Sequence, residues 1–380
     1  MVLLILAGVS INLVVGENGI VTKAGDARDK TEQAKANEEA DLLGLEETIN
    51  KSTVNLPSTT ETKPYLPTGF SKVAGTNLDN GLVIQDSVGN QYVWVEVPMN
   101  ETVYPTAGLG ITTFDDTAYT NIENDLRTYT STYRDGTSDT DTYCPDTDNT
   151  GWFESADKYN EAKQKMLKSV YQNGGFYVGR YETGIATTQS PRTASGDTTQ
   201  TPVIKANAYP YNYVTRTQAK VLAESMEHGD KTSSLMFGVQ WDLTLAFMHN
   251  KGKVADSTLT SGSKTIGNYY DSLWNVTNTS AKYSTDSGAS WSPCPKNKNG
   301  SSANILLTTG ADTSFGVMNI YDIAGNVCEW TLEYTSYPMG PYISRGGSYG
   351  GYAYLIPASG RDMTETTDGN VFVGFRVSLY

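Results

Sequence analysis

The last sixty residues, 321–380, constrain the fold more than any other part of the chain. Three landmarks follow one another there: YDIAGNVCEWT at 321–331, SRGGSY at 344–349 and GFRVSLY at 374–380. Between the last two landmarks, residues 350–373 mix aromatic, small and polar side chains without a helical or strand period. We therefore expect a long surface loop between two rigid anchors, which is where binding residues commonly lie.

The three landmarks resemble the closing signature of the formylglycine-generating-enzyme (sulfatase-modifying factor) family, a variant of the C-type-lectin fold. Two upstream segments, YVWVEVP at 92–98 and GFYVGRYE at 175–182, resemble the family's opening strands. The resemblance covers residues 69–380. It implies an α+β fold of the C-type-lectin-like, formylglycine-generating-enzyme-like type for this part of the chain.

The segment before this domain has a different composition. Residues 1–15 are apolar, and the first charge is Glu17, so a helix there is about 22 Å long and shorter than the ~30 Å hydrocarbon core. Residues 23–50 continue in helical composition, and prolines at 57, 64 and 67 indicate a linker over 56–68.

Residues 1–55 resemble the second half of a Gram-positive type IV pilin-like N-terminal helix whose basic leader is missing. The alternative is an ordinary buried helix. The resemblance implies attachment to the membrane through the N-terminal helix, other pilin subunits as partners, and a location at the cell surface.

Charge and cysteine content exclude several classes of function. The formal net charge of −14 argues against a nucleic-acid partner, which needs a basic face. The three cysteines do not form a Cys-x-x-Cys motif. Either Cys144 and Cys294 form a disulfide or all three thiols are free. Cys328 replaces a residue that is usually aromatic in the family, so we expect it in the core.

Periodicity and capping residues predict three helices. The first covers 155–173 and ends at Gly174, the second begins at the capping box of Thr215, and the third carries an apolar stripe through Trp241. Strands are expected from Leu82 onward and at the C-terminus. Residues 101–152 and 252–309, rich in Thr, Ser, Asp and Asn, are expected to be mostly surface loops.

The family's best-known enzymes oxidise a cysteine to formylglycine with two cysteines that follow the Gly-Gly-Ser landmark. Residues 349–356 contain no cysteine, and Gly, Tyr or Ala cannot replace a thiolate nucleophile or copper ligand. A second branch, the sulfoxide synthases, binds iron through histidines. The chain has only His228 and His249, which are not clustered and are read as helix-end residues. We therefore expect no enzymatic activity.

The resemblance also implies a structural calcium site, although no cofactor is required for binding. The matching ligands are the carboxylates of Asp322 and Glu329 and the backbone oxygens of Gly325 and Val327, and oxygen-only ligation suits Ca²⁺. The alternative is an Asx-type turn followed by a strand carboxylate, with no metal.

The C-terminal loop resembles the variable region of proteins diversified by retroelements, which use the same lectin-type fold. Mutagenesis at adenines converts asparagine codons into codons for residues of the types found in this loop. The resemblance implies a ligand-binding surface made of Ser348, Tyr349, Gly350, Gly351, Tyr352, Tyr354, Leu355, Ile356, Gly360, Asp362, Asp368, Gly369, Val371, Phe372 and Val373.

Tyrosine gives such a surface large contact area at low entropic cost, so the expected anchors are Tyr349, Tyr352, Tyr354 and Phe372. Three arginines in and beside the landmarks are expected to be scaffold residues paired with carboxylates: Arg345, Arg361 and Arg376.

Together these features predict a non-enzymatic, surface-displayed receptor or adhesin that binds an unidentified protein or glycan through a diversified loop. The alternatives are a minor pilin of fixed specificity and, less favoured, a formylglycine-generating oxidase.

Overall fold

The computed structural model describes residues 62–134, 141–146, 151–300, 302–336, 340–364 and 369–380. The chain divides into two compact units, Met1–Asn55 and Leu56–Tyr380. The expected pilin-like helix lies outside the described residues, and everything below concerns the second unit. Among the described helices, none has the length and apolar character needed to cross a membrane.

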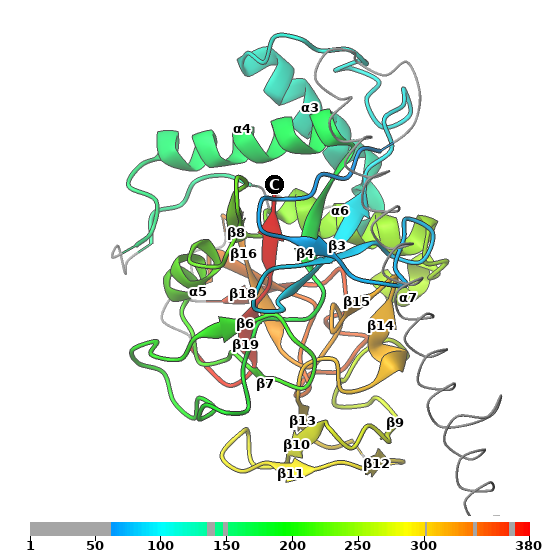
Figure 1. Ribbon diagram of the computed structural model, residues 1–380, viewed down its shortest axis with the longest axis vertical. Helices are drawn as coiled ribbons and strands as arrows, with labels where there is room; N and C mark the ends of the chain where they lie inside the picture. The colour runs from blue at the N-terminus through cyan, green and yellow to red at the C-terminus, as the bar shows by residue number, and fades with distance from the viewer. Residues whose placement is uncertain (1–61, 135–140, 147–150, 301, 337–339, 365–368) are drawn as a thin grey trace, which may run out of the picture. The chain divides into compact units, whose positions relative to one another are not determined.

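The second unit has a mixed α+β fold built around a six-stranded sheet in which every pair of neighbours is antiparallel (Figure 1). In spatial order its strands are β1 (Ser71–Lys72), β2 (Val83–Gln85), β3 (Gln91–Glu96), β4 (Gly175–Gly179), β20 (Val377–Leu379) and β8 (Ser233–Leu235). The C-terminal strand thus lies between two strands that come much earlier in the chain. This arrangement joins both ends of the domain in one hydrogen-bonded layer.

A second sheet of four strands carries the C-terminal landmarks. In spatial order its strands are β18 (Arg361–Thr364), β17 (Tyr342–Arg345), β16 (Cys328–Tyr334) and β19 (Val373–Phe375). The β16–β19 pair is parallel and the other two pairs are antiparallel. Only Arg376 separates β19 from β20, so the chain passes directly from the second sheet into the first.

Short strand pairs complete the β structure, and several of them form a layer at the bottom of Figure 1. One small sheet consists of β6 (Pro202–Val203), β5 (Gly184–Ile185) and β7 (Tyr209–Pro210). The others are β11 (Ser292–Pro293) with β10 (Lys282–Ser284) and β13 (Leu306–Leu307), β12 (Lys296–Lys298) with β9 (Trp274–Val276), and β14 (Gly316–Val317) with β15 (Ile320–Tyr321).

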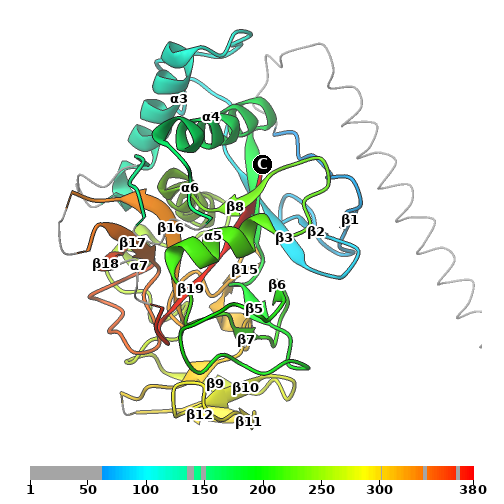
Figure 2. The ribbon, with the colours of Figure 1, turned by 90° about the vertical axis from the view of Figure 1, so that its left-hand side faces the viewer.

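The helices lie mostly beside the two large sheets (Figure 2). They are α3 (Asp116–Tyr129), α4 (Ala156–Asn173), α5 (Arg216–Glu224), α6 (Gly238–Asn250) and α7 (Asp256–Thr260), with 3₁₀ turns η2 (Ser131–Tyr133) and η3 (Thr313–Phe315). Helix α6 contacts both β3 and β16, and its side chains are buried on every face from Gly238 to Met248. A helix buried all round is part of the core, as expected for the stripe through Trp241.

The predicted helix ends are confirmed. The Ser155 side chain caps α4 by accepting the N–H of Lys158, and Gly174 ends it with φ 69°, the left-handed conformation that glycine adopts at little cost. Thr215 and Gln218 form the capping box of α5.

The expectation of loops over 101–152 is wrong for α3. Its Asp115 caps the helix by accepting the N–H of Ala118, and Ile122 and Leu126, four residues apart, are buried where α3 packs against α4. Threonine and asparagine have low helix propensity, so the local sequence does not indicate a helix here. Burial against the rest of the domain stabilises it instead.

Two further expectations need correction. The described part of the expected linker packs onto the domain: Tyr65 is buried, and its hydroxyl donates to the carbonyl of Leu379 at 2.7 Å. The expected loop 350–373 contains β18, which pairs with β17 and buries the side chain of Arg361 while Met363 stays exposed.

Candidate ligand-binding face

A buried ionic network holds the two ends of the loop. Arg345 from β17 and Arg361 from β18 both pair with Asp242 of α6 and Glu333 of β16. The Nε atoms of Arg345 and Arg361 lie 2.9 and 3.0 Å from the carboxylate oxygens of Glu333. Arg134 adds a third guanidinium, 2.8 Å from Asp242. The expectation that Arg345 and Arg361 are scaffold residues is confirmed.

The arginines of this network strongly lower the pKa of Glu333. Burial alone would raise the pKa of Glu333, but Arg361, Arg345 and Arg134 outweigh it and lower that pKa to about 2. Glu333 is therefore ionised at neutral pH, where it pairs with both arginines. The two loop ends are thus attached to the core helix α6 and to the central strand β16.

Arg376 plays the same role between the two sheets. Its guanidinium donates to both oxygens of Glu329 at 2.6–3.1 Å and to the backbone carbonyls of Gly179 and Tyr321, each at 2.8 Å. Since Gly179 belongs to β4 and Glu329 to β16, Arg376 joins the sheets directly, and its expected scaffold role is confirmed.

The Gly-Asn turn of the first landmark is held by hydrogen bonds. Asn326 has φ 57° and is fully buried; its amide donates to the Glu182 carboxylate and to the carbonyl of Leu307, and its oxygen accepts from Asn268 and the Leu307 N–H. The Asn326 side chain therefore uses its full bonding capacity. These hydrogen bonds explain why an asparagine stands at this position of the first landmark.

The predicted calcium ligands do not fit a cation in this arrangement. Both oxygens of Glu329 are bound by Arg376, which places a positive charge where calcium would need the carboxylate. Asp322 accepts the Gly310 N–H at 2.6 Å. Among the described residues, no group of three or more His, Cys, Asp or Glu side chains is arranged to hold a metal.

Three carboxylates crowd around this one arginine. Burial, followed by repulsion from Asp322 and Glu329, raises the pKa of Glu182. Burial also raises the pKa of Asp322 to about 6 and that of Glu329 to about 7. The cluster therefore carries an electrostatic cost near neutral pH that protonation relieves.

The three cysteines are free thiols, which removes the Cys144–Cys294 disulfide alternative. Cys328 is buried, as expected for a core residue, and its thiol donates to the carbonyl of Phe372 at 3.1 Å. Burial raises the pKa of Cys328 to about 12, so its thiol is inert. His249 lies at the end of α6, where its Nδ1 is 2.9 Å from the carbonyl of Val254.

Two glycines start the loop. Gly346 and Gly347 have φ of 88° and 70°, and a Cβ on Gly347 would lie 2.4 Å from the carbonyl oxygen of Ile356. The Tyr269 hydroxyl donates to the carbonyl of Gly346 at 2.6 Å. The chain therefore turns tightly here and approaches the far side of the loop closely.

A second segment, 259–271, supports the loop and was missed in the sequence. The Tyr270 N–H donates to the Gly351 carbonyl at 2.9 Å, and the Asp271 carboxylate accepts the Ala353 N–H at 3.0 Å. Further along, the Ser359 N–H donates to the carbonyl of Leu259. No signal in residues 259–271 indicates these contacts, because they pair segments about ninety residues apart.

Three exposed side chains of the loop and the half-buried Tyr270 beside them form a surface that we call the tyrosine ridge: Tyr270, Tyr352, Tyr354 and Leu355. The ring centroids of Tyr270 and Tyr352 are 5.1 Å apart and those of Tyr352 and Tyr354 are 5.5 Å apart. The exposed fractions of Tyr352, Tyr354 and Leu355 are 39%, 62% and 64%. The ridge thus presents large apolar side chains to solvent on a hydrogen-bonded backbone.

Two expected ligand contacts are corrected by their burial. Tyr349 is 1% exposed and packs in a small core with Leu306 and Val327, while Val373 is 3% exposed in β19. Burial raises the pKa of Tyr349 to about 12. Phe372 is half-buried, its ring 5.1 Å from that of Tyr349, so it supports the loop more than it anchors a ligand.

The other residues expected to bind the ligand are neither fully exposed nor fully buried where the structure describes them. Half-buried are Ser348, Gly350, Gly351, Ile356, Gly360, Asp362, Gly369 and Val371. Asp368 lies outside the described residues. The arm 369–373 is held by another segment: the Asn212 amide donates to the carbonyl of Val371 at 3.1 Å. A Cβ on Gly350 would lie 2.4 Å from the Phe372 ring, so the arm packs against the start of the loop.

Residues 240–379 match the family model of the sulfatase-modifying factor enzyme 1-like domain, which confirms the resemblance for the part running from α6 to β20. No curated protein matches the chain. A solved structure that is similar, Treponema denticola variable protein 1, has 15% identity over 54% of this chain and 84% of that chain, with a TM-score of 0.30. Similarity at that level does not define the fold of this chain.

Proposed function

We propose that the chain is a non-enzymatic ligand-binding protein whose C-terminal loop is the binding face, displayed at a cell surface and diversified by a retroelement. The observation that supports it most is the contrast within the loop. Its landmark residues are buried and paired, whereas Tyr352, Tyr354 and Leu355 between them are exposed. A binding protein needs both properties, since rigid aromatic anchors bind at low entropic cost.

The ridge has the composition of a protein or glycan interface. Tyrosine side chains offer flat apolar faces and a hydroxyl, and they are enriched among residues that dominate binding energy. Tyr352 lies in the middle, with Tyr270 on one side and Tyr354 on the other. A ligand that covers all three rings would bury Tyr352 most completely.

The same loop supports the non-enzymatic part of the proposal. Residues 349–356, where the oxidising enzymes of the family carry cysteines, contain none. Cys328, the cysteine of the first landmark, has a thiol that burial keeps protonated. The loop therefore offers side chains for contact rather than for oxidation.

The test is a double substitution on the ridge, Tyr352→Ala with Tyr354→Ala. The protein is screened on arrays of glycans and of extracellular proteins, and each ligand found is titrated against the wild type and the variant. We expect roughly a thousandfold loss of affinity, because each of the two rings is an anchor worth about 2 kcal/mol. The melting temperature should stay unchanged, since both rings face solvent.

The control pair is Val88→Ala with Leu109→Ala, which removes exposed apolar surface elsewhere. Val88 is 63% exposed, the same as Tyr354 within one per cent, and Leu109 is 45% exposed. The control should bind as the wild type does. Equal binding by the ridge variant would overturn the proposal, and so would a large loss of its stability, which would place the rings in the core.

A further inference from the structure

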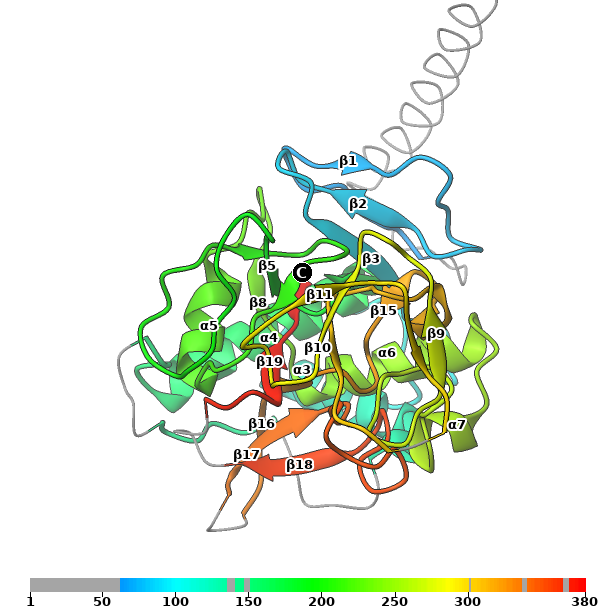
Figure 3. The same cartoon turned by 90° about the horizontal axis from the view of Figure 1, so that it is seen from below.

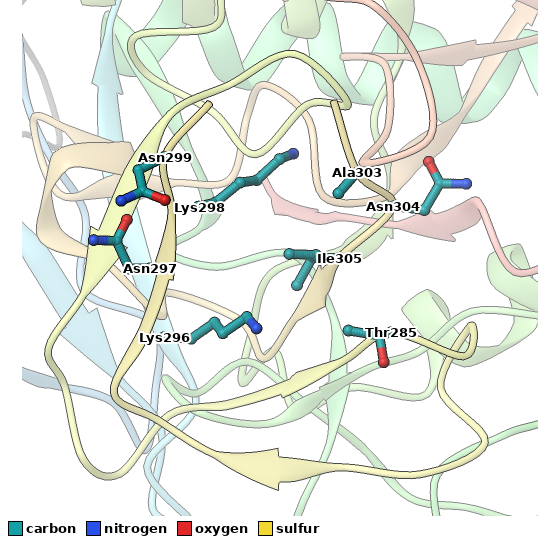
Figure 4. A pocket seen from close by; sticks show the side chains of 8 residues that line it. All are labelled: Thr285, Lys296, Asn297, Lys298, Asn299, Ala303, Asn304 and Ile305. Carbon is teal, nitrogen blue, oxygen red and sulfur yellow. The ribbon is translucent and has the colours of Figure 1, made fainter. Parts of the chain in front are cut away.

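A polar cavity of about 490 Å³ lies among the short strands β9–β13 (Figure 4). Its walls carry two lysines, Lys296 and Lys298, and three asparagines, Asn297, Asn299 and Asn304. The strands that form it lie away from α3 and α4 in Figure 1 and can be followed from below in Figure 3. Nothing in the landmark motifs accounts for this cavity.

The two lysine side chains extend from β12 toward Ile305 and Ala303 (Figure 4). Lys298 is 4% exposed, and its ammonium donates to the carbonyl of Tyr269 at 2.6 Å. An ammonium has three N–H groups, so two remain for a ligand after this bond. The Nζ of Lys296 lies 4.8 Å from the ring centroid of Tyr283, which holds that ammonium at the wall.

The buried ammonium is poorly compensated. Burial lowers the pKa of Lys298 to about 8, although Asp271 acts in the opposite direction. A negative group in the cavity would stabilise the charged form. Two ammonium groups in a chain of net charge −14 thus create a local positive site.

The cavity adjoins the tyrosine ridge through residues 269–270. The Ala303 N–H donates to the carbonyl of Tyr270 at 3.1 Å, and Lys298 binds the carbonyl of Tyr269. The ring of Tyr270 packs against Tyr352. The backbone of residues 269–270 is therefore hydrogen-bonded to two residues of the cavity wall, and the ring of Tyr270 belongs to the ridge.

We propose that the cavity binds the carboxylate-bearing sugar of an acidic glycan whose remaining sugars lie on the tyrosine ridge. This proposal rests on the function proposed above. The lysines pair with the carboxylate, and the Thr285 hydroxyl binds a sugar hydroxyl. The C–H faces of the neighbouring sugars pack on the tyrosine rings.

An acidic peptide suits this cavity less well. Its walls offer six polar side chains and only Ala303 and Ile305 as apolar contacts. The neighbouring ridge adds exposed tyrosine rings, whose flat faces match the C–H faces of sugar rings better than a flexible acidic side chain.

The test is calorimetric titration of the full chain with sialyllactose, with oligogalacturonate and with neutral lactose. Binding of either acidic saccharide, with lactose at least ~10-fold weaker, supports the proposal. The two acidic probes separate the sources of the carboxylate, a sialylated glycan or a uronic-acid polymer. Failure of both to bind, or equal binding of lactose, overturns it.

Lys296→Gln should weaken the binding of the acidic saccharide about tenfold, which is the usual effect of losing one charge-assisted hydrogen bond. Lys296 is chosen because it is half-exposed, whereas Lys298 is buried and its loss would disturb folding. Lys296→Arg should restore part of the affinity. The matched control is Lys282→Gln, since the Nζ of Lys282 also lies over a tyrosine ring, 5.2 Å from that of Tyr209, outside the cavity.

The two proposals fail in different ways. If the ridge variant loses a ligand that Lys296→Gln still binds at wild-type strength, the cavity assignment is overturned and the ridge remains the binding face. If a glutamate-rich peptide binds the wild type as tightly as the saccharides, with the same dependence on Lys296, the glycan assignment is overturned.

Discussion

At the scale of single residues, the loop depends on buried charges that have partners. Glu333 is shared by Arg345 and Arg361, and each of the three has a side chain with at most 2% exposure. Removing one partner from such a group leaves an uncompensated charge in the core. The network is therefore the residue-level reason that exposed tyrosines can stand on a fixed backbone.

Arg345→Met tests this directly. We expect it to lower the free energy of unfolding by about 3–5 kcal/mol, because Glu333 and Asp242 stay buried with less compensation. Urea unfolding followed by circular dichroism measures the change. The control is Lys158→Met, which removes one partner of an exposed ion pair with Glu161 and should have no measurable effect. An equally small effect of Arg345→Met would refute the role of the network.

The acidic cluster gives the protein a specific pH dependence. A carboxyl whose pKa is raised on folding is bound more tightly to its proton in the folded state. The raised values of Asp322 and Glu329, about 6 and 7, therefore make the free energy of unfolding fall as the pH rises from about 4 to about 7. Glu333 has a lowered pKa of about 2 in the folded protein, so its protonation lowers the free energy of unfolding only below about pH 4.

Asp322→Asn should flatten this dependence. It removes one of the crowded charges, keeps an oxygen for the Gly310 N–H, and suits the φ of 56° that asparagine tolerates. We expect a gain on the order of 2 kcal/mol at pH 7.5 and little change at pH 4. Thermal unfolding across this range measures it, and a loss of stability at pH 7.5 would contradict the assignment.

The calcium expectation has a simple test. Arg376 already binds both carboxylate oxygens of Glu329. Adding millimolar Ca²⁺ after treatment with a chelator should therefore leave the melting temperature unchanged. A rise of several degrees that Glu329→Gln removes would instead establish a calcium site at this turn.

At the scale of elements, the loop depends on the tight turn between β17 and the ridge. We expect Gly347→Ala to destabilise the protein by at least ~2 kcal/mol, since a Cβ would meet the Ile356 carbonyl and the φ of 70° disfavours alanine. Gly351→Ala is the matched control, because its nearest neighbour would lie 3.7 Å away. Limited proteolysis of the loop checks both, and equal resistance in both variants would argue against a fixed turn.

Much of this element structure was predictable from local signals. Helices α4 and α5 have explicit caps, and the strands that carry the landmarks have strong β patterns. Helix α3 was missed because only Ile122 and Leu126 are fully buried among its apolar residues, within a run of threonine and asparagine. Its helical state is decided by packing on α4, which no local pattern records.

The candidate site was predictable only in part. Tyr352 and Tyr354 were correctly placed on the surface, but Tyr349, of the same residue type, is buried. Composition cannot separate these tyrosines, because their burial is set by distant partners such as Leu306 and Val327. The contribution of Tyr270 was invisible for the same reason.

At the scale of the whole molecule, the two sheets act as a frame that holds the proposed binding face. Arg376 joins the sheets, and the loop begins and ends in strands of the second sheet. Substitutions on the ridge would leave this frame intact, whereas substitutions at Tyr349 or Val373 would disturb the core. The account therefore predicts where sequence variation is allowed.

The most direct test of the central claim is to sequence this locus and its relatives across one population of the source organism. The account predicts substitutions at adenine-derived codons, concentrated at exposed and half-exposed positions such as Tyr352, Tyr354 and Leu355, beside a template repeat and a reverse transcriptase gene. Tyr349, Val373, Arg345 and Arg361 should be constant. An invariant loop with no template nearby, or substitutions equally frequent at the buried positions, would contradict it and favour a pilus subunit or adhesin of fixed specificity.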